Sequence, residues 1–594
     1  MSKIKLSDYI AKRLKEHGVE HFFMVSGGGA MHLNDSLGQA ITYTANHHEQ
    51  ACAIAAEGYA RVNQKLAVVN VTTGPGGLNC LNGVFGQWTD SVPVLYISGQ
   101  VKYSTTMASC PEIPLRQLGD QEVDIISCVK PLTKYAKMVT EPNEIKYHLD
   151  RAIYEATTGR FGPVWLDIPI NIQASLIDEN ELKEFVPPQK LQYECDIDEV
   201  INKLKSAKRP LIVAGNGIHC AKQENNFTDF IEGLNIPVVT TFNGVDLIPT
   251  EHKNFCGRIG TVGQRAGNFN LQNADVILFL GTRNNIRQAS YNWENFAKNA
   301  FKMVVDIDKA ELDKPLVKPD LAIYCDLTEF LPRLLNRKSE LVSAKNSEWL
   351  KFCKNLFLKY SFEHTKEYQS KDSVINVYDF VHSLSKAMQE NDILIAANGS
   401  ACVCAHQVFE IKQGERVFWN SGDASMGYGL PAAIGACYEA NTRNVVCLEG
   451  DGSIMMNIQE LQTIAYNKLP IKLFVINNQG YSSIRQTQRN FFSGRMTGSG
   501  DDSGVSVPNF VEVGKAFGLK TKRIENPKTM EKEIEEVLAA DGAVLCEVIA
   551  EKEYAFLPKL SARKLDDGTM VSPSLEDMFP FLDREEFEGN VIND

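Results

Sequence analysis

Polar residues that suit a metal ion and a phosphate group follow two apolar segments in the last third of the chain. Gly450-Asp451-Gly452-Ser453 come one residue after the run 444–448, and Asn477-Asn478 follow the run 471–476. Apolar runs of this length predict buried strands, and the segment 454–468 between them has the spacing of a helix. Both polar clusters are therefore expected at the carboxyl ends of neighbouring parallel strands, where open α/β sheets bind ligands.

These side chains offer the chemistry of a metal-bound diphosphate. Asp451 supplies a carboxylate and Asn478 an amide oxygen, and Mg²⁺ binds a few such oxygens together with phosphate oxygens and water. Gly450 and Gly452 allow the backbone to approach a diphosphate, and Ser453 with the first amides of the helix can donate to it. An ordinary turn would explain a lone Gly-Asp-Gly, but the added asparagine pair favours a metal site.

Four motifs, found in the same order along the chain, resemble those of a known enzyme family. Gly450-Asp451-Gly452 through Asn477-Asn478 resembles the thiamine-diphosphate (ThDP) motif, and the chain resembles the acetolactate synthase family along most of its length. The other matches are a glutamate-bearing helix, a glycine-rich substrate loop and a segment that carries a coenzyme wedge. They read His48-Glu49-Gln50 through Arg61, Thr73-Gly74-Pro75-Gly76-Gly77 followed by Asp90-Ser91-Val92-Pro93, and Met426-Gly427-Tyr428-Gly429 through Gly435.

The resemblance implies roles for residues of the reacting centre. Glu49 would bond the pyrimidine ring of ThDP and so promote loss of the C2 proton, which leaves a carbon nucleophile for a 2-keto acid. Gln121 would lie near the reacting carbonyl, and Met426 would hold the coenzyme bent. A surface helix acid is the alternative for Glu49, and core packing is the alternative for Met426.

The resemblance also implies the residues that bind the coenzyme and its metal. Those expected to contact ThDP are Gly74, Gly76, Gly77, Met426, Gly450, Gly452 and Ser453. Those expected to coordinate Mg²⁺ are Asp451, Asn478 and the backbone carbonyl of Gly480.

Acetolactate synthases carry FAD on a central domain, and part of that site has counterparts here. Gly215 opens a Gly-x-Gly after an apolar strand, Arg283 stands in a Gly-x-Arg, and Asp306 ends another predicted strand. A plain strand–helix turn explains a lone Gly-x-Gly equally well. Where the family has two acidic residues after the Gly-x-Arg, this chain has Asn284-Asn285, so both FAD and a bare turn stay open.

The expected acceptor pocket departs from that of a biosynthetic acetolactate synthase. Thr487 stands where such enzymes carry a tryptophan, and Asp120 replaces a phenylalanine beside Gln121. A wider and more polar pocket suits an acceptor with many hydroxyl groups. Cations that would suit a phosphorylated acceptor are Arg485, Arg489, Lys559, Arg563 and Lys564. These features are similar to relatives that transfer an acetyl unit to a keto group of a nucleotide-linked sugar, although charged residues are usually just solvated.

Length and patterning predict an α/β protein of three domains, each a doubly wound, mostly parallel sheet with flanking helices. We place a pyrimidine-binding domain at 1–185, a central domain with a possible FAD site at 190–340 and a diphosphate- and Mg²⁺-binding domain at 370–555. Residues 556–594 form a tail that is a candidate cover for the active site. The family further implies a homo-oligomer, dimer or tetramer, whose active site joins Glu49 of one subunit to Asp451 of another.

Composition excludes several other classes. A net charge of −13 argues against nucleic acid as a general partner, and no long apolar run predicts a membrane span. The 14 cysteines include no Cys-x-x-Cys pair. Cys402 and Cys404 are expected on alternate positions of a strand, and all thiols are expected to be reduced in a cytoplasmic protein.

The leading hypothesis is a ThDP- and Mg²⁺-dependent carboligase with pyruvate or a close 2-keto acid as donor. Its carbonyl acceptor would be a keto nucleotide sugar or, as in acetolactate synthase, a second keto acid. A decarboxylase or an oxidase would use the same cofactor with another fate for the two-carbon unit. A non-catalytic ThDP-binding subunit is disfavoured because Glu49, Asp451 and Asn478 are all present. A nicotinamide dehydrogenase is disfavoured because Thr240-Thr241-Phe242-Asn243 replace the acidic residue expected after the next strand.

Overall fold

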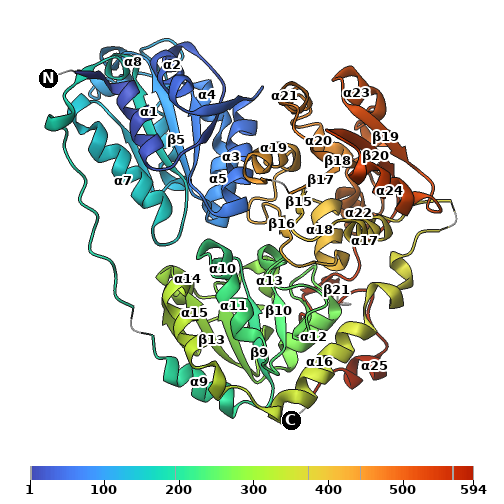
Figure 1. Ribbon diagram of the computed structural model, residues 1–594. Coiled ribbons are helices and arrows are strands. Elements are labelled where there is room, and N and C mark those ends of the chain that lie inside the picture. Colours follow the sequence, from blue (N-terminus) through green and yellow to red (C-terminus); the bar gives the residue numbers. More distant parts are fainter. Residues whose placement is uncertain (1–2, 194, 372, 442, 565–566, 593–594) are drawn as a thin grey trace.

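The computed structural model describes residues 3–592 apart from 194, 372, 442 and 565–566. Three α/β lobes follow one another along this part of the chain, coloured blue, green and orange to red in Figure 1. Each lobe contains a six-stranded sheet whose neighbouring strands are parallel. The predicted fold class is confirmed.

The sheet of the first lobe is buried on both faces at its centre. Its central strands are apolar over nearly their whole length, which is the pattern of a parallel strand covered by helices on both sides. In spatial order the strands are β3 (Thr42–Ala45), β2 (His21–Met24), β4 (Ala67–Val71), β5 (Val94–Gln100), β7 (Val164–Pro169) and β6 (Tyr135–Met138). The α-helices are α1 (Leu6–Glu16), α2 (Met31–Ala40), α3 (Glu49–Asn63), α4 (Pro75–Asn79), α5 (Leu81–Asp90), α6 (Ile125–Val129), α7 (Ile145–Thr157) and α8 (Ile170–Gln173). A two-stranded antiparallel pair, β1 (Ile4–Lys5) and β8 (Leu176–Ile177), ties the two ends of the lobe together.

The second lobe repeats this arrangement and begins after an extended linker, visible at the left of Figure 1. Its strands are β11 (Phe255–Arg258), β10 (Val238–Thr240), β9 (Pro210–Ala214), β12 (Val276–Leu280), β13 (Phe301–Asp306) and β14 (Leu321–Tyr324). Its α-helices are α9 (Ile197–Ser206), α10 (Gly217–Cys220), α11 (Glu224–Ile231), α12 (Arg265–Asn273), α13 (Ile286–Ala289), α14 (Lys309–Asp313) and α15 (Leu327–Asn336). Asp196 and Asp326 cap the first amides of α9 and α15, which fixes where these helices begin.

The third lobe places two strands side by side whose carboxyl ends carry the polar motifs. These strands are β17 (Val445–Gly450) and β18 (Lys472–Asn477), paired so that Gly450 lies opposite Ile476. The rest of the sheet is β16 (Arg416–Phe418), β15 (Ile393–Ala396), β20 (Val544–Ile549) and β19 (Lys520–Ile524). The α-helices are α17 (Val377–Ala387), α18 (Ser400–Val408), α19 (Gly429–Glu439), α20 (Asp451–Ile454), α21 (Glu460–Asn467), α22 (Ser482–Phe491), α23 (Phe510–Ala516) and α24 (Met530–Ala539).

Helices α3 and α19 join the first lobe to the third at very short range. A Cβ atom on Gly58 of α3 would lie 2.0 Å from the carbonyl oxygen of Ala432, and one on Gly435 of α19 would lie 1.8 Å from that of Ala55. Only glycine permits backbones to approach so closely. The two helices lie side by side between the lobes in Figure 1, and this packing holds the N-terminus of α3 against the third lobe.

The C-terminal tail lies against the second lobe and its connector helix α16 (Ser347–Lys359). Asn268 donates to the carbonyl of Leu575 (3.1 Å) and Asn273 to that of Asn590 (2.8 Å). Tyr360 donates to Glu586 of α25 (Arg584–Gly589) at 2.8 Å. The tail also contains the short hairpin of β21 (Arg563–Lys564) and β22 (Met570–Val571). The side chains of Arg563 and Lys564 are outside the described residues.

Three local predictions are wrong. The single helix expected over 454–468 is broken into α20 and α21, because the side chain of buried Asn457 donates to the carbonyl of Gly427 (2.8 Å) and the chain turns there. Cys402 and Cys404 lie on helix α18, not on a strand. A disulfide joins Cys195 to Cys325, so not all thiols are reduced; the two residues are 130 positions apart, and only folding brings the linker to the end of β14.

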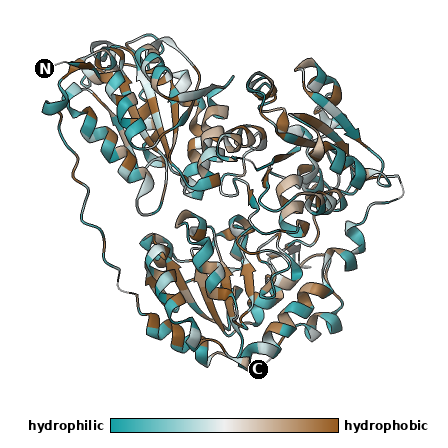
Figure 2. Ribbon diagram, viewed as in Figure 1, coloured by the Kyte–Doolittle hydropathy of each residue, from teal (hydrophilic) through white to brown (hydrophobic). Residues whose placement is uncertain are grey.

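Hydropathy follows this architecture. In Figure 2 the strands are predominantly hydrophobic, whereas many outer helices have one hydrophobic and one hydrophilic side. None of the helices in the described part of the chain is long and apolar enough to span a membrane.

Candidate coenzyme site

The carboxylate of Asp451 is held by backbone amides at the ends of β17 and β18. Its Oδ1 accepts a hydrogen bond from the amide of Gly452 (2.6 Å), and its Oδ2 accepts from the amides of Asn478 (3.0 Å) and Gly480 (2.9 Å). Burial raises the pKa of Asp451 to about 6, although these three amides act in the opposite direction. Adjacent parallel strands therefore bring the two polar motifs together, as the strand–turn–helix–strand pattern predicts.

The residues around Asp451 fit a cation. Asn478 is 4% exposed, and its Oδ1 has no hydrogen-bond partner among the described residues. Its Nδ2 donates to the hydroxyl of Tyr554 (3.3 Å), which fixes the amide with Oδ1 left free. A buried carboxylate beside a buried, unsatisfied amide oxygen is an unfavourable arrangement that a divalent ion would resolve.

The turn after β17 is closely packed at Gly452 and open at Gly450, and it is tied to the segment that carries Met426. A Cβ atom on Gly452 would lie 2.2 Å from the ring of Tyr481, so this position admits only glycine in the present packing. Gly450, by contrast, borders open space, since a Cβ atom there would have only the Cβ of Ser453 within 4 Å, at 3.9 Å. The hydroxyl of Ser453 accepts from the amide of Gly427 (2.9 Å), which places half-buried Met426 beside the turn.

The first lobe gathers a second set of predicted residues around Glu49. Glu49 is the first residue of α3, and its Oε2 accepts from the side chain of Asn79 (2.9 Å). A Cβ atom on Gly76 would lie 3.6 Å from the other carboxylate oxygen. Gly74, at φ +62°, lies so close to the carbonyl of Gln121 that a Cβ atom there would be 1.9 Å away. The glycine-rich loop thus lies between Glu49 and Gln121.

Two other predicted residues in this lobe take different positions. A Cβ atom on Gly77 would lie 3.0 Å from the side chain of Ile125, so Gly77 is needed for packing. Asp120 is exposed, like its neighbour Gln121. Both follow a loop that Glu122 holds by accepting hydrogen bonds from the amides of Leu118 and Gly119, each at 3.0 Å.

Hydrogen bonds connect the start of α3 to the third lobe of the same chain. Glu460 of α21 accepts from the side chain of Asn46 (2.8 Å) and from the amide of His47 (2.9 Å). Asn457 donates to the side chain of Gln50 at 3.3 Å. Among the described residues no hydrogen bond or ion pair joins Glu49 itself to the Asp451 turn. The two clusters are therefore held in fixed relation without direct contact between their carboxylates.

Comparison with known proteins identifies the family. Three family models match in order: the N-terminal TPP binding domain of thiamine pyrophosphate enzymes at residues 4–127, their central domain at 197–334 and their C-terminal TPP binding domain at 397–548. Over 574 residues the chain is 33% identical to the acetolactate synthase large subunit of Lactococcus lactis, covering 95% of this chain and 96% of that protein. The chain belongs to the acetolactate synthase-like family. It is also 29% identical over 543 residues to the isozyme 2 large subunit of acetolactate synthase from Escherichia coli, covering 91% of this chain and 95% of that protein.

Membership of the acetolactate synthase-like family makes this chain a ThDP-dependent enzyme. The family predicted from the sequence motifs is confirmed, and ThDP is the cofactor that the matched domains support. The Asp451 turn lies in the matched C-terminal domain, and Glu49 lies in the matched N-terminal domain.

The second lobe of this family member contains a cavity of about 410 Å³ at the predicted FAD residues. Arg283 and Asp306 line it. Gly215 does not line it directly but packs behind Gly281, which does: a Cβ atom on Gly215 would be 2.4 Å from the carbonyl oxygen of Gly281. Burial raises the pKa of Asp306 to about 6. Asn284 is engaged within the protein, since its Oδ1 accepts from Thr282 (2.9 Å) and Gln288 (2.7 Å).

The cavity also touches the first lobe. Arg283 donates to the carbonyl of Thr89 (2.7 Å), and Arg160 donates to Asp308 (2.8 Å) and Glu311 (2.9 Å). A molecule in this cavity would therefore contact both lobes. Asn216, which also lines it, has a buried Oδ1 without a partner among the described residues. The lining therefore offers an acceptor as well as the guanidinium groups of Arg160, Arg283 and Arg287.

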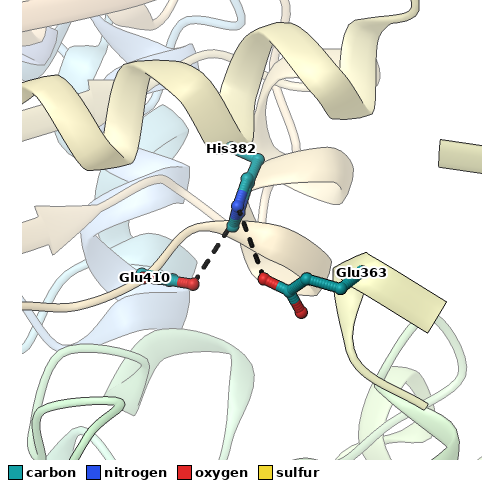
Figure 3. Close-up of side chains that lie close together, drawn as sticks. All are labelled: Glu363, His382 and Glu410. Carbon is teal, nitrogen blue, oxygen red and sulfur yellow. Dashed lines mark ion pairs between the residues drawn. The ribbon is translucent and has the colours of Figure 1, made fainter. Parts of the chain in front are cut away.

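A separate cluster of metal-ligating side chains lies beside the connector between the second and third lobes. His382 stands between two glutamates (Figure 3). Its Nε2 lies 4.0 Å from a carboxylate oxygen of Glu363, and its Nδ1 lies 3.9 Å from one of Glu410. Lys386 pairs with Glu410 at 2.5 Å, and the ring of Phe362 stacks on His382 at 3.9 Å. The two carboxylates face different ring nitrogens and one already has a cation, which is the arrangement of an ion-pair network.

Sequence reasoning missed several residues of the coenzyme site. Tyr554 and Asn79 orient Asn478 and Glu49, but neither lies within a recognisable motif. Arg485 was expected to face an acceptor, but it is 2% exposed. Its guanidinium donates to the backbone carbonyls of Asn478 and Gln479 in the loop 478–480, the candidate metal loop. A long charged side chain on a mostly polar helix gives no sequence signal that it is buried.

Proposed function

We propose that this chain is a ThDP- and Mg²⁺-dependent carboligase. It would decarboxylate pyruvate or a close 2-keto acid and transfer the two-carbon acyl unit to a carbonyl acceptor. The observation that carries this proposal is the unsatisfied buried oxygen of Asn478 beside the carboxylate of Asp451, at the carboxyl ends of two paired strands. Such a site suits a metal that anchors a diphosphate.

When bound, ThDP would supply a carbon nucleophile that adds to the keto acid and accepts the electrons released with CO₂. Asp451, Asn478 and the carbonyl of Gly480 would hold the Mg²⁺, and Ser453 would orient the diphosphate. Glu49 would hold a proton at its carboxyl group against the pyrimidine ring, with Asn79 fixing one carboxylate oxygen. Gly74 and Gly76 keep side-chain atoms out of the space between Glu49 and Gln121.

We further propose a polar acceptor, with a keto nucleotide sugar as the leading candidate. Thr487 is exposed on α22 and bonds only the carbonyl of Ser483 (3.1 Å) among the described residues, so the position of the family tryptophan is open. Asp120 and Gln121 are exposed at the mouth of the glycine loop. Arg485 is excluded from this acceptor set because its charge is buried in the metal loop. Arg489 pairs with Glu553, which reduces its availability to a phosphate.

The cavity of the second lobe is proposed as an FAD site, with Arg283 on a phosphate, Gly215 at the close backbone approach and Asp306 at a ribose hydroxyl. Its lining of guanidinium, carboxyl and small residues suits a dinucleotide.

We also propose a homo-oligomer in which Glu49 of one subunit serves the Asp451 site of another.

The test is product analysis by NMR with purified protein, ThDP, Mg²⁺ and ¹³C-pyruvate, alone and with a panel of 4-keto nucleotide sugars. A labelled two-carbon branch on a sugar is the expected result. Acetolactate formed at the same rate with and without the sugars would replace the sugar acceptor by a keto acid. Free acetaldehyde, or oxygen consumption, would replace the carboligase by a decarboxylase or an oxidase.

A further inference from the structure

Arg485 is an unusual residue of helix α22, because its charged side chain is almost completely buried without a paired carboxylate in close contact. Its exposed fraction is 2%, and the nearest carboxylate oxygen, from Glu553, is 4.0 Å from its Nε. Its two terminal nitrogens are instead bonded to carbonyl oxygens, whereas its Nε has no hydrogen-bond partner among the described residues. Nη2 donates to Asn478 (2.8 Å) and Lys552 (2.9 Å), and Nη1 donates to Gln479 (3.0 Å) and Ser499 (3.1 Å).

These four carbonyls come from three separate segments. Asn478 and Gln479 belong to the loop after β18, Lys552 follows β20, and Ser499 follows α22. The planar guanidinium presents several donors in a fixed fork, so one side chain can reach all three segments at once. The amide of Tyr481 also donates to the carbonyl of Ser499 (2.9 Å), so a backbone hydrogen bond joins two of these segments as well.

One peptide unit and one residue of the metal loop are each held by hydrogen bonds at both ends. The peptide that joins Gln479 to Gly480 gives its carbonyl to Arg485 and its amide to Asp451. Asn478 likewise gives its amide to Asp451 and its carbonyl to Arg485. With its backbone fixed in this way and its Nδ2 on Tyr554, Asn478 has only its Oδ1 left without a partner.

We infer that Arg485 is a positioning residue for the metal site: it holds the loop 478–480 so that the oxygen ligands of that loop face the same point as the carboxylate of Asp451. This inference rests on the proposed Mg²⁺–ThDP site. Partners that orient metal ligands typically contribute 10- to 100-fold in metal affinity. Arg485 touches neither metal nor substrate in this role, so its loss should weaken cofactor binding more than the chemical step.

The experiment measures binding of Mn²⁺, as a probe for Mg²⁺, by calorimetry in the presence of saturating ThDP. Arg485→Met keeps the side-chain length and removes every donor. We expect Mn²⁺ affinity to fall about 10- to 100-fold, with kcat returning towards the wild-type value at saturating metal. Arg485→Lys retains the charge but loses the forked set of donors, so its Mn²⁺ affinity should lie between those of the wild type and Arg485→Met.

Arg443→Met is the matched control. Arg443 also donates to backbone carbonyls of the third lobe, those of Ala440 (3.2 Å) and Glu439 (3.4 Å), but it lies away from the metal loop. Its replacement should leave Mn²⁺ affinity unchanged.

Wild-type Mn²⁺ affinity in a folded Arg485→Met protein, with or without a lower melting temperature, would overturn the inference. If that variant does not fold, Arg485→Lys decides: a weaker affinity supports the role, and an unchanged affinity refutes it. Failure of the wild-type protein to bind Mn²⁺ with ThDP would instead refute the proposed function, so the two failures are distinguishable.

Discussion

At the scale of single residues, Glu49 is the group whose replacement should separate binding from catalysis. Glu49→Gln keeps the shape of the side chain and its contact with Asn79 but removes the carboxyl proton. Because positioned acid–base groups contribute about 10²- to 10⁴-fold to rate, turnover should fall at least 100-fold. ThDP and Mg²⁺ affinities should stay within a few-fold, since the Asp451 turn is untouched.

The measurement is steady-state turnover together with calorimetric titration of ThDP. Glu141→Gln, at an exposed position of the same lobe, is the control and should change neither quantity. A Glu49→Gln enzyme with near-normal turnover would remove Glu49 from the mechanism.

Individual residues show what the sequence can and cannot predict. Asp451 and Asn478 were predictable because each directly follows an apolar strand, and strand pairing then places them together. The buried position of Arg485 could not be predicted, because it depends on carbonyl groups from segments distant in sequence, such as that of Lys552. The disulfide of Cys195 and Cys325 was hidden for the same reason.

At the scale of elements, the packing of α3 on α19 should be intolerant of a single methyl group. Gly435→Ala would place Cβ 1.8 Å from the carbonyl of Ala55, so the helix backbones must separate. Overpacking of this kind costs about 1–3 kcal/mol, and the melting temperature should fall by several degrees. Since α3 begins with Glu49, the same separation should also lower activity.

The matched control is Gly589→Ala in helix α25, where the added Cβ has nothing within 4 Å. Thermal unfolding followed by circular dichroism should show little change for this variant. An equal melting temperature for Gly435→Ala and the wild type would mean that the two helices are not packed as described.

Helices and strands could be predicted where the sequence shows a clear pattern of apolar residues, and the predictions were wrong where it does not. Strands β17 and β18 agree with the apolar runs within two residues. Helix α18 is buried along its whole length, so it shows no amphipathic period, and its cysteines resembled alternate positions on a strand. The break between α20 and α21 depends on Asn457 bonding the distant carbonyl of Gly427, which no local pattern reveals.

At the scale of the whole molecule, the proposed homo-oligomer predicts that each active site combines Glu49 of one subunit with Asp451 of another. Within one chain the carboxylate of Glu49 accepts a hydrogen bond from Asn79. Among the described residues, no ion pair or hydrogen bond links Glu49 to Asp451. If the proposed oligomer joins Glu49 of one subunit to Asp451 of another, Glu49→Gln and Asp451→Asn should each be inactive alone. A mixed dimer would then contain one site in which both residues are intact.

The two purified variants are mixed at equal concentration under conditions of subunit exchange, and turnover is measured over time. Half of the dimers would be mixed and each would hold one intact site, so activity should rise to about one quarter of the wild-type value. The double variant mixed with wild type supplies the control, because a mixed dimer of these two chains would hold no intact site. Persistent inactivity of the mixture, with exchange verified by labelled subunits, would place both halves of the site in one chain. That outcome would require α3 and the Asp451 turn of a single subunit to close on the coenzyme together.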